Sequence, residues 1–188
     1  MANNNYDFCI GTNKPALKRT LASMLAEAGF YSSGEAKNIP DYLRTLRTVQ
    51  PWLAVIDTSL PPGNIEQLAD IIENDGLAAA IYINTSGVDL DLYVQLKWPV
   101  ETSVLTAVAE VVCNEFAHKK KLQKEINNLQ RKLSERKNIE KAKGIISKKY
   151  KLTEEEAYQA LRKSSMKNRT TAAEMSKQII ENPDCLYV

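Results

Sequence analysis

The side chains best suited to binding chemistry lie in the last quarter of the chain, where an aromatic residue and several polar or cationic residues follow one another at helical spacing. Four of them follow one another at spacings of four, three and four: Tyr158, Arg162, Ser165 and Arg169. Such spacing places them on one face of a helix, and an aromatic ring beside guanidinium planes can stack on bases that are splayed out of a nucleic-acid loop. The alternative is that Tyr158 packs into a small core while the arginines are solvated. The first interpretation predicts a surface for binding, not for catalysis.

A second row of such positions lies just before that helix. Lys137, Lys141, Gly144 and Lys148 align at helical spacing, and a glycine inside a helix costs about 1 kcal/mol relative to alanine. We therefore expect something to approach the backbone closely at Gly144: either a nucleic-acid phosphate or, more commonly, another helix. Further lysines would attract phosphates at long range, so that affinity falls steeply with salt; they are Lys143, Lys149, Lys151, Lys163 and Lys167.

Charge is divided unevenly along the chain. Residues 1–117 hold 7 basic and 14 acidic side chains, a net charge of −7, whereas residues 118–188 hold 18 and 9, a net charge of +9. A polyanion is attracted only to the cationic part, so nucleic acid or a membrane surface is expected to contact the C-terminal part alone. The acidic part would be repelled and is expected to regulate.

Several function classes are disfavoured by what the sequence lacks. Cys9, Cys113 and Cys185 match no metal-ligand spacing, and an odd number of thiols without a signal sequence fits a reducing cytoplasm. His118, the only histidine, has no nearby Cys, Asp or Ser partner, which argues against a catalytic or metal-binding role. No uncharged apolar run approaches the roughly 20 residues that span a bilayer. We expect a soluble cytoplasmic protein that is not an enzyme, holds no cofactor or metal and does not contact a membrane.

The first 112 residues alternate short apolar runs with amphipathic segments, which indicates a parallel sheet covered by helices on both faces. In α/β sheets of this kind, functional groups lie at the carboxyl ends of the strands, here Gly11 to Asn13, Asp57, and Asn84 with Thr85. Asn13 is also the predicted N-cap of the first helix. The predicted strands are residues 7–10, 31–33, 52–56 and 78–83, and the predicted helices are residues 15–28, 40–49 and 65–75.

A long helix is predicted from Glu101 onward, because neither Gly nor Pro follows Pro99 until Gly144. Within it, four apolar residues at spacings of four, three and four form a heptad seam flanked by Lys, Glu and Arg: Leu122, Ile126, Leu129 and Leu133. The seam predicts a homodimer through a coiled coil. The alternative is an amphipathic helix that packs on its own chain.

Two capping boxes follow the long helix. Thr153 precedes Glu156 by three residues and Thr171 precedes Glu174 by three, so each pair can satisfy free backbone N–H groups at a helix start. Helices are therefore predicted at residues 154–167 and 172–180. One apolar stripe on each of three helices predicts a small core, formed by Ile139, Ala142, Ile146, Ala157, Ala160, Leu161, Met175 and Ile179.

Residues 133–181 resemble the ANTAR domain, a three-helix RNA-binding unit of bacterial transcription antiterminators. The resemblance is carried by the run from Ala142 to Ile145, by Glu156-Ala157-Tyr158, by Leu161-Arg162 and by Met166. It implies that stem-loops in RNA are the partner. The RNA-contacting residues predicted in this unit are Lys141, Lys143, Gly144, Lys148, Tyr158, Arg162, Ser165, Lys167 and Arg169.

The first 112 residues resemble a two-component receiver domain, which implies a flavodoxin-like, doubly wound sheet with Asp57 at the phosphoacceptor position. Receivers place an acidic pair after the first strand, where this chain has Thr12 and Asn13. The hydroxyl and amine expected after the fourth and fifth strands fall at about Asn84 and Trp98. Mg²⁺ prefers carboxylate ligands and phosphoryl transfer depends on charge neutralisation, so Asp57 is predicted to be a vestigial acceptor in a pseudo-receiver. The fourth helix of a receiver is expected to be shortened or lost between Thr85 and Trp98.

Together these patterns predict three parts: a pseudo-receiver at residues 1–112, a coiled-coil linker at 113–135 and an ANTAR-type RNA-binding unit at 136–188. The leading hypothesis is an RNA-binding antiterminator that stabilises hairpins in nascent leader mRNA. Its receiver-like part would respond to a ligand, a partner protein or oligomerisation rather than to phosphorylation. The alternatives are a DNA-binding response regulator that uses a helix-turn-helix, and a coiled-coil adaptor that acts through protein–protein contacts.

Overall fold

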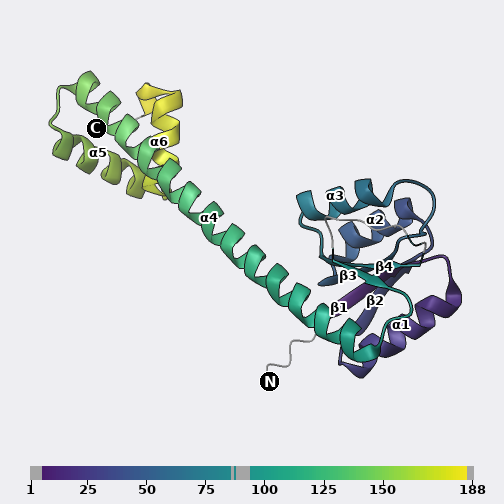
Figure 1. The fold of residues 1–188 in the computed structure, drawn as a ribbon. Coiled ribbons are helices and arrows are strands. Elements are labelled where there is room, and N and C mark those ends of the chain that lie inside the picture. Colours follow the sequence, from purple (N-terminus) through teal and green to yellow (C-terminus); the bar gives the residue numbers. More distant parts are fainter. Residues whose placement is uncertain (1–5, 86, 88–93, 186–188) are drawn as a thin grey trace. The chain divides into compact units, whose positions relative to one another are not determined.

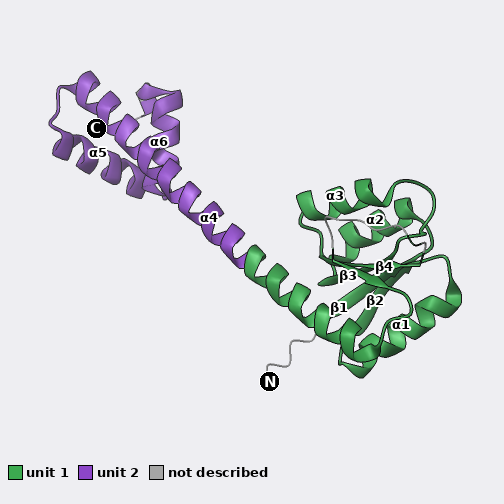
Figure 2. Ribbon diagram, in the orientation of Figure 1, with its two compact units in different colours: residues 1–120 green, residues 121–188 purple. Residues whose placement is uncertain are grey.

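The computed structural model describes residues 6–85, 87 and 94–185. The chain divides into two compact units, residues 1–120 and residues 121–188 (Figure 2). The N-terminal unit contains a sheet with helices, and the C-terminal unit is helical (Figure 1).

The N-terminal unit is built on five parallel strands in the order β2-β1-β3-β4-β5. β1 and β3 are buried along their whole length, as their continuous apolar runs predict. This arrangement confirms the predicted doubly wound α/β fold. The elements are β1 (Asp7–Gly11), α1 (Pro15–Glu27), β2 (Tyr31–Ala36), α2 (Ile39–Val49), β3 (Leu53–Asp57), α3 (Ile65–Asn74), β4 (Ala79–Asn84), β5 (Gln95–Lys97) and the first part of α4 (Thr102–Tyr150).

Two hydrophobic layers hold the helices to the sheet. α1 and α4 share one layer, to which they contribute Leu21 and Leu105 among others. α2 and α3 share the other, through residues such as Tyr42 and Leu68. The Tyr42 hydroxyl is buried and donates to the carbonyl of Cys9 at 2.9 Å, so the polar end of this large ring is satisfied inside the core.

The turn that precedes α1 differs from the prediction. Asn13 is not the N-cap of α1: the cap position is Lys14, without a side-chain capping bond, and Pro15 begins the helix. The Thr12 hydroxyl instead accepts from the Lys14 backbone N–H at 3.1 Å and so orders the turn before the helix. The predicted shortening of the fourth receiver helix falls on residues 86 and 88–93, which lie outside the described residues.

α4 is a single helix of 49 residues that passes from one unit into the other. The four seam side chains, Leu122, Ile126, Leu129 and Leu133, are between 47% and 58% exposed. None of them belongs to a buried core of the described chain, so the alternative in which the seam packs on its own chain finds no support. The homodimer stays a prediction.

The C-terminal unit consists of the end of α4, α5 (Glu154–Lys167), α6 (Ala172–Glu181) and the short η1 (Pro183–Cys185). Both predicted capping boxes are formed. The Thr153 N–H donates to Glu156 at 2.9 Å, and the Thr171 N–H donates to Glu174 at 3.0 Å. The predicted small core is confirmed, with these fully buried members: Ala142, Ile146, Ala157, Leu161, Met175 and Ile179. Within the described part of the chain, no helix combines the length and apolarity needed to cross a membrane.

Candidate functional site

Asp57, the last residue of β3, carries a carboxylate that is fully buried at the carboxyl end of the sheet. Its Oδ2 accepts from the Thr12 hydroxyl at 2.8 Å. Its Oδ1 accepts from the Ser59 N–H at 3.0 Å, from the Ser59 hydroxyl at 2.8 Å and from the Thr85 hydroxyl. Loops after three different strands therefore converge on one carboxylate and fill its acceptor positions.

Lys14 completes this cluster, a role that sequence reasoning missed. Its Nζ lies 3.4 Å from Asp57 Oδ2 and donates to the Thr85 hydroxyl at 2.7 Å. The ammonium thus comes from the loop after β1, whereas receivers are expected to supply it after the fifth strand. The only sequence signal was the place of Lys14, two residues after Thr12, at the carboxyl end of a parallel strand.

The two residues predicted to occupy the positions of the receiver hydroxyl and amine make other contacts. Asn84 is buried and accepts from the Gly87 N–H at 2.7 Å, so the hydroxyl beside Asp57 belongs to Thr85, one residue later. Trp98 packs partly buried against the core layer of α1 and α4. The assignment to Asn84 was therefore wrong by one residue, because β4 continues through Asn84 before the loop begins.

The environment of Asp57 favours a charged carboxylate that is already satisfied. Burial raises the pKa of Asp57, but the hydrogen bonds from Thr85, Ser59 and Thr12 outweigh it and hold this pKa below its ordinary value. A divalent cation does not fit this donor set, because hydroxyls replace the expected carboxylates and an ammonium already neutralises the charge. Among the described residues, no group of three His, Cys, Asp or Glu could hold a metal ion.

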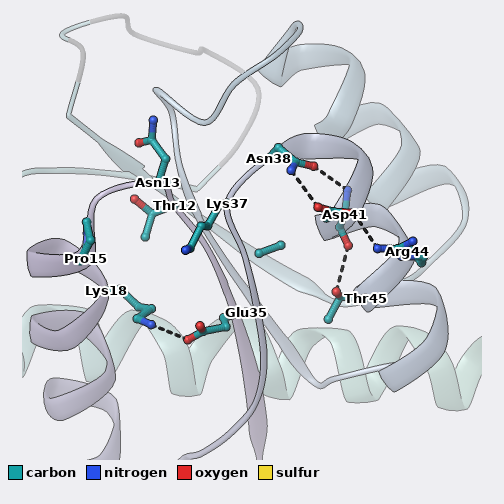
Figure 3. A pocket seen from close by; sticks show the side chains of 11 residues that line it. Thr12, Asn13, Pro15, Lys18, Glu35, Lys37, Asn38, Asp41, Arg44 and Thr45 are labelled. Atoms are coloured by element: carbon teal, nitrogen blue, oxygen red, sulfur yellow. Dashed lines mark hydrogen bonds and ion pairs between the residues drawn. The ribbon is translucent and has the colours of Figure 1, made fainter.

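A hollow of about 480 Å³ opens beside this cluster, between the first turns of α1 and α2 (Figure 3). Two ion pairs line it: Lys18 with Glu35 at 2.7 Å and Arg44 with Asp41 at 2.7 Å. Asn38 caps α2 by accepting from the Asp41 N–H at 2.8 Å and also donates to the Asp41 carboxylate. The walls are therefore polar, and much of their charge is neutralised internally.

On the C-terminal unit, most of the predicted RNA-contacting side chains are exposed. Tyr158 is 38% exposed and is not part of the small core, so its ring is available to a partner. The cations Lys141, Lys148, Arg162, Lys167 and Arg169 are exposed as well. Arg169 follows the C-cap of α5 with a φ of 53°, and its N–H donates to the Met166 carbonyl at 3.2 Å. The end of α5 therefore fixes the backbone that carries Arg169.

Two predicted contact residues are placed differently. Ser165 is buried, and its hydroxyl donates to the Arg162 carbonyl at 2.8 Å, so it does not share the exposed face. The Lys143 side chain is only 16% exposed and lies 3.0 Å from Glu140 and 3.7 Å from Glu154. The hydrogen bond to Glu140 raises the pKa of Lys143. These ion pairs compete with any contact between Lys143 and a phosphate.

Gly144 lies on the exposed side of α4, and a Cβ built on it would meet no atom within 4 Å. The prediction that another helix explains this glycine therefore fails within the described chain. The space beside the Gly144 backbone is open, and a partner can reach it.

Met166 is a further surface residue that sequence reasoning did not assign to the contact face. It is 70% exposed, the largest exposure among the large apolar side chains of the described residues. Tyr158, Arg162 and Met166 are spaced by four residues each and so form one row along α5. The repeated spacing was visible in the sequence, but an apolar residue such as Met166 on an amphipathic helix is usually expected to lie in the core.

Known proteins resemble both units of the chain. Residues 127–180 match the sequence profile of the ANTAR domain. The C-terminal unit is an ANTAR domain. Along most of its length, the chain is 24% identical over 180 residues to the transcriptional regulatory protein PdtaR of Mycobacterium tuberculosis, a match that covers 92% of this chain and 88% of that protein.

The N-terminal unit resembles receiver domains in fold. The receiver domain of a modulated diguanylate cyclase from Desulfovibrio desulfuricans aligns with a TM-score of 0.56 and 17% identity, over 62% of this chain and 99% of that one. The beryllofluoride-activated NtrC4 receiver domain aligns with a TM-score of 0.51 and 18% identity, over 58% and 98%. The chain thus joins a receiver-like domain to an ANTAR domain.

Proposed function

We propose that this protein is an RNA-binding regulator of transcription antitermination, which stabilises hairpins in a nascent leader transcript so that a competing terminator cannot form. The observation that carries the proposal is the exposed row of Tyr158, Arg162 and Met166 on an ANTAR domain with a cationic surface. The similarity to a transcriptional regulatory protein along most of the chain is consistent with it.

The α5 row suits unpaired bases better than duplex nucleic acid. Bases in a hairpin loop can leave the stack and lie against an aromatic ring or a guanidinium plane. In the proposed complex, Tyr158 and Arg162 provide these planes and Met166 offers a polarisable apolar contact. Lys141, Lys148 and Lys167 then contact phosphates, which fix position and add affinity without reading sequence.

The Gly144 face gives the RNA backbone a second place of approach. A side chain at this position would meet nothing in the chain itself, so the absence of one is not required by packing. A phosphate held by Lys141 and Lys148 can come close to the helix only where no Cβ stands in the way. We assign this face to the stem of the hairpin and the α5 row to its loop.

Two ANTAR domains in one dimer would bind two hairpins of the same transcript. The exposed seam from Leu122 to Leu133 is the proposed dimer contact. Once one hairpin is bound, the second binds at a high effective concentration, so overall affinity rises without new contacts.

Control of the receiver-like domain is proposed to come from a ligand, a partner protein or oligomerisation rather than from phosphorylation. The oxygens of Asp57 already accept from Thr12, Ser59 and Thr85. The hollow between α1 and α2 is where a small polar ligand could act. Incubation with small phosphodonors and Mg²⁺ should leave the mass of the intact protein unchanged; a stable increase that is absent from Asp57→Asn would overturn this part.

The RNA proposal is tested by filter binding of the full-length protein to a folded RNA pool and to duplex DNA at matched salt. Preference for RNA, lost in Tyr158→Ala and Arg162→Ala, is expected. Lys124→Ala removes an exposed cation of α4 that lies outside the proposed face, and it serves as the control. Preference for duplex DNA would favour a DNA-binding regulator, and indifference to both would favour a protein-interaction adaptor.

A further inference from the structure

The residues that flank the exposed seam of α4 indicate whether two copies of this helix would pair in the parallel or the antiparallel direction. We propose that the seam pairs with a second copy of this chain in the antiparallel sense. This inference rests on the dimer of the proposed function and specifies its geometry. It follows from the charged residues that flank the seam, all of which are exposed along this part of α4.

The heptad register is set by the apolar residues themselves. Spacings of four, three and four assign Leu122 and Leu129 to d positions and Ile126 and Leu133 to a positions. The g positions before each a residue are then Glu125 and Lys132. The e positions after each d residue are Gln123 and Gln130, and the next e position is Lys137.

A parallel pair would bring together the wrong flanking residues. In that arrangement each g residue faces the e residue that lies five positions later on the other helix. Lys132 would meet the partner's Lys137, and the same repulsive contact would occur twice by symmetry. Glu125 would meet the partner's Gln130, so no opposite charges would face each other across the seam.

An antiparallel pair satisfies both the apolar and the charged positions. Each a residue then faces a d residue, so Ile126 packs on the partner's Leu129 and Leu122 packs on the partner's Leu133. Flanking contacts run from g to g, which places Glu125 beside the partner's Lys132, again twice. The two glutamines face each other and can exchange hydrogen bonds. Opposite charges meet in this orientation, and complementary flanking charges are what sets helix direction in coiled coils.

The layers beyond the seam do not alter the choice. Lys119 and Arg136 occupy the next a and d positions, and cations would meet at both ends in either orientation. They limit the contact to about two heptads, so the flanking pairs decide the direction. An antiparallel seam sends the two ANTAR domains out at opposite ends. Ala142 lies about 15 residues from the seam centre, so at 1.5 Å per residue the two small cores stand roughly 40 Å apart along the axis.

The first test uses a substitution whose effect has opposite signs in the two orientations. Lys132→Glu places a carboxylate beside the partner's Glu125 in the antiparallel dimer and beside the partner's Lys137 in a parallel one. We expect the dimer dissociation constant of the full-length protein, measured by sedimentation equilibrium at low salt, to rise about 3- to 10-fold. The double variant Glu125→Lys with Lys132→Glu should restore it. An unchanged or tighter dimer for Lys132→Glu would overturn the inference.

Disulfide cross-linking gives an independent readout in a Cys185→Ser background, where Cys9 and Cys113 remain buried. Antiparallel pairing predicts that a mixture of Ile126→Cys and Leu129→Cys chains forms mixed disulfide dimers, while Leu129→Cys alone forms few. The reverse pattern would establish parallel pairing and overturn the inference. A chain that stays monomeric would overturn it too; continued binding of a single hairpin by that monomer would show that the proposed RNA function survives.

Discussion

At the scale of single residues, the two units differ in whether their notable side chains are already satisfied by contacts within the chain. Asp57 is buried and has its hydrogen-bonding capacity filled from within the chain by Thr12, Ser59 and Thr85. Tyr158 and Met166 expose apolar surface that no other part of the described chain covers. A satisfied group stabilises the fold, and an uncovered one is available for binding. This difference supports the proposal that the exposed α5 row, and not Asp57, contacts RNA.

Asp57 is expected to contribute stability that depends on pH. Because its folded pKa lies below the ordinary value, the contribution is complete above the unfolded pKa of about 3.9 and is lost as pH falls through the folded pKa. Asp57→Asn places an amide among hydroxyl and ammonium donors and should cost roughly 1–3 kcal/mol at neutral pH. The deficit should shrink as pH falls below about 4.

Urea unfolding followed by tryptophan fluorescence measures this effect, because Trp52 and Trp98 both lie in the N-terminal unit. Glu27→Gln removes an exposed carboxylate from α1 and is the matched control, with little change expected at either pH. A deficit of the same size at pH 7 and pH 3 would contradict the assigned charge state of Asp57.

Gly144 is expected to lower the stability of the ANTAR domain and, in return, to allow an RNA hairpin to bind closely. Alanine fits the open space beside it, so Gly144→Ala is expected to raise the stability of the ANTAR domain by about 0.5–1 kcal/mol. If a phosphate approaches the backbone there, the same change should weaken binding of a single hairpin about 10-fold. Thermal unfolding by circular dichroism and RNA titration provide the two readouts.

The control for Gly144→Ala is Ser134→Ala, which improves helix propensity at an exposed position of α4. It should stabilise the helix without affecting hairpin binding. Should Gly144→Ala stabilise the protein and bind RNA as well as before, close approach of RNA at this face would be ruled out.

At the scale of elements, agreement with the sequence was best where the signal was local. β1 and β3 were predictable from continuous apolar runs, and α5 and α6 from two short capping motifs. The Asp57 cluster was less predictable, because it depends on which way the loop side chains point once three strands align. Spacing placed Thr12, Asp57 and Thr85 at one edge of the sheet, but it did not show that Lys14 would turn inward.

Ser165 illustrates the same limit on a helix. Its spacing from Arg162 placed it on the exposed face, but positions three apart are separated by about 60° around a helix axis. The row of Tyr158, Arg162 and Met166 turns outward, and Ser165 falls on the buried side. A small hydroxyl that can bond back to a helix carbonyl tolerates either environment, so composition alone does not decide between them.

The capping boxes are expected to contribute to the stability of the whole ANTAR domain. Thr153→Ala removes the hydroxyl that accepts from the Glu156 N–H and should destabilise the domain by about 1 kcal/mol. Thr153→Ser keeps an acceptor at the same place and should lose much less. Chemical unfolding followed by the helical circular dichroism signal compares the two variants; equal losses would mean that the methyl group of Thr153, not its hydroxyl, is the stabilising part.

At the scale of the whole molecule, the two halves of the chain carry opposite net charges and therefore act differently on a polyanion. Residues 118–188 carry a net charge of +9 and residues 1–117 a net charge of −7. A transcript is attracted to one and repelled by the other, so the receiver-like domain can influence binding without touching RNA. Within one chain, α4 belongs to both units and also carries the exposed seam. Changes in dimerisation therefore offer a direct route by which the receiver-like domain could alter RNA affinity.

The dimer makes the strongest quantitative prediction for the intact protein. Ile126→Asp combined with Leu129→Asp puts four carboxylates into the seam of each dimer and should yield monomers. Binding to an RNA with two hairpins should then weaken by roughly 100-fold or more, because the gain from effective concentration is lost. Binding to a single hairpin should change little, because the substituted residues lie outside the ANTAR core.

Val111→Asp is the matched control, since it changes an apolar α4 residue that is 62% exposed but lies outside the seam. It should leave the dimer and both affinities unchanged. The two RNAs must be compared at one salt concentration, because added carboxylates weaken binding of any polyanion and salt screens that effect. Equal losses on both RNAs for the seam variant would show that charge, not dimer dissociation, weakened binding, and the bivalent mechanism would then be rejected.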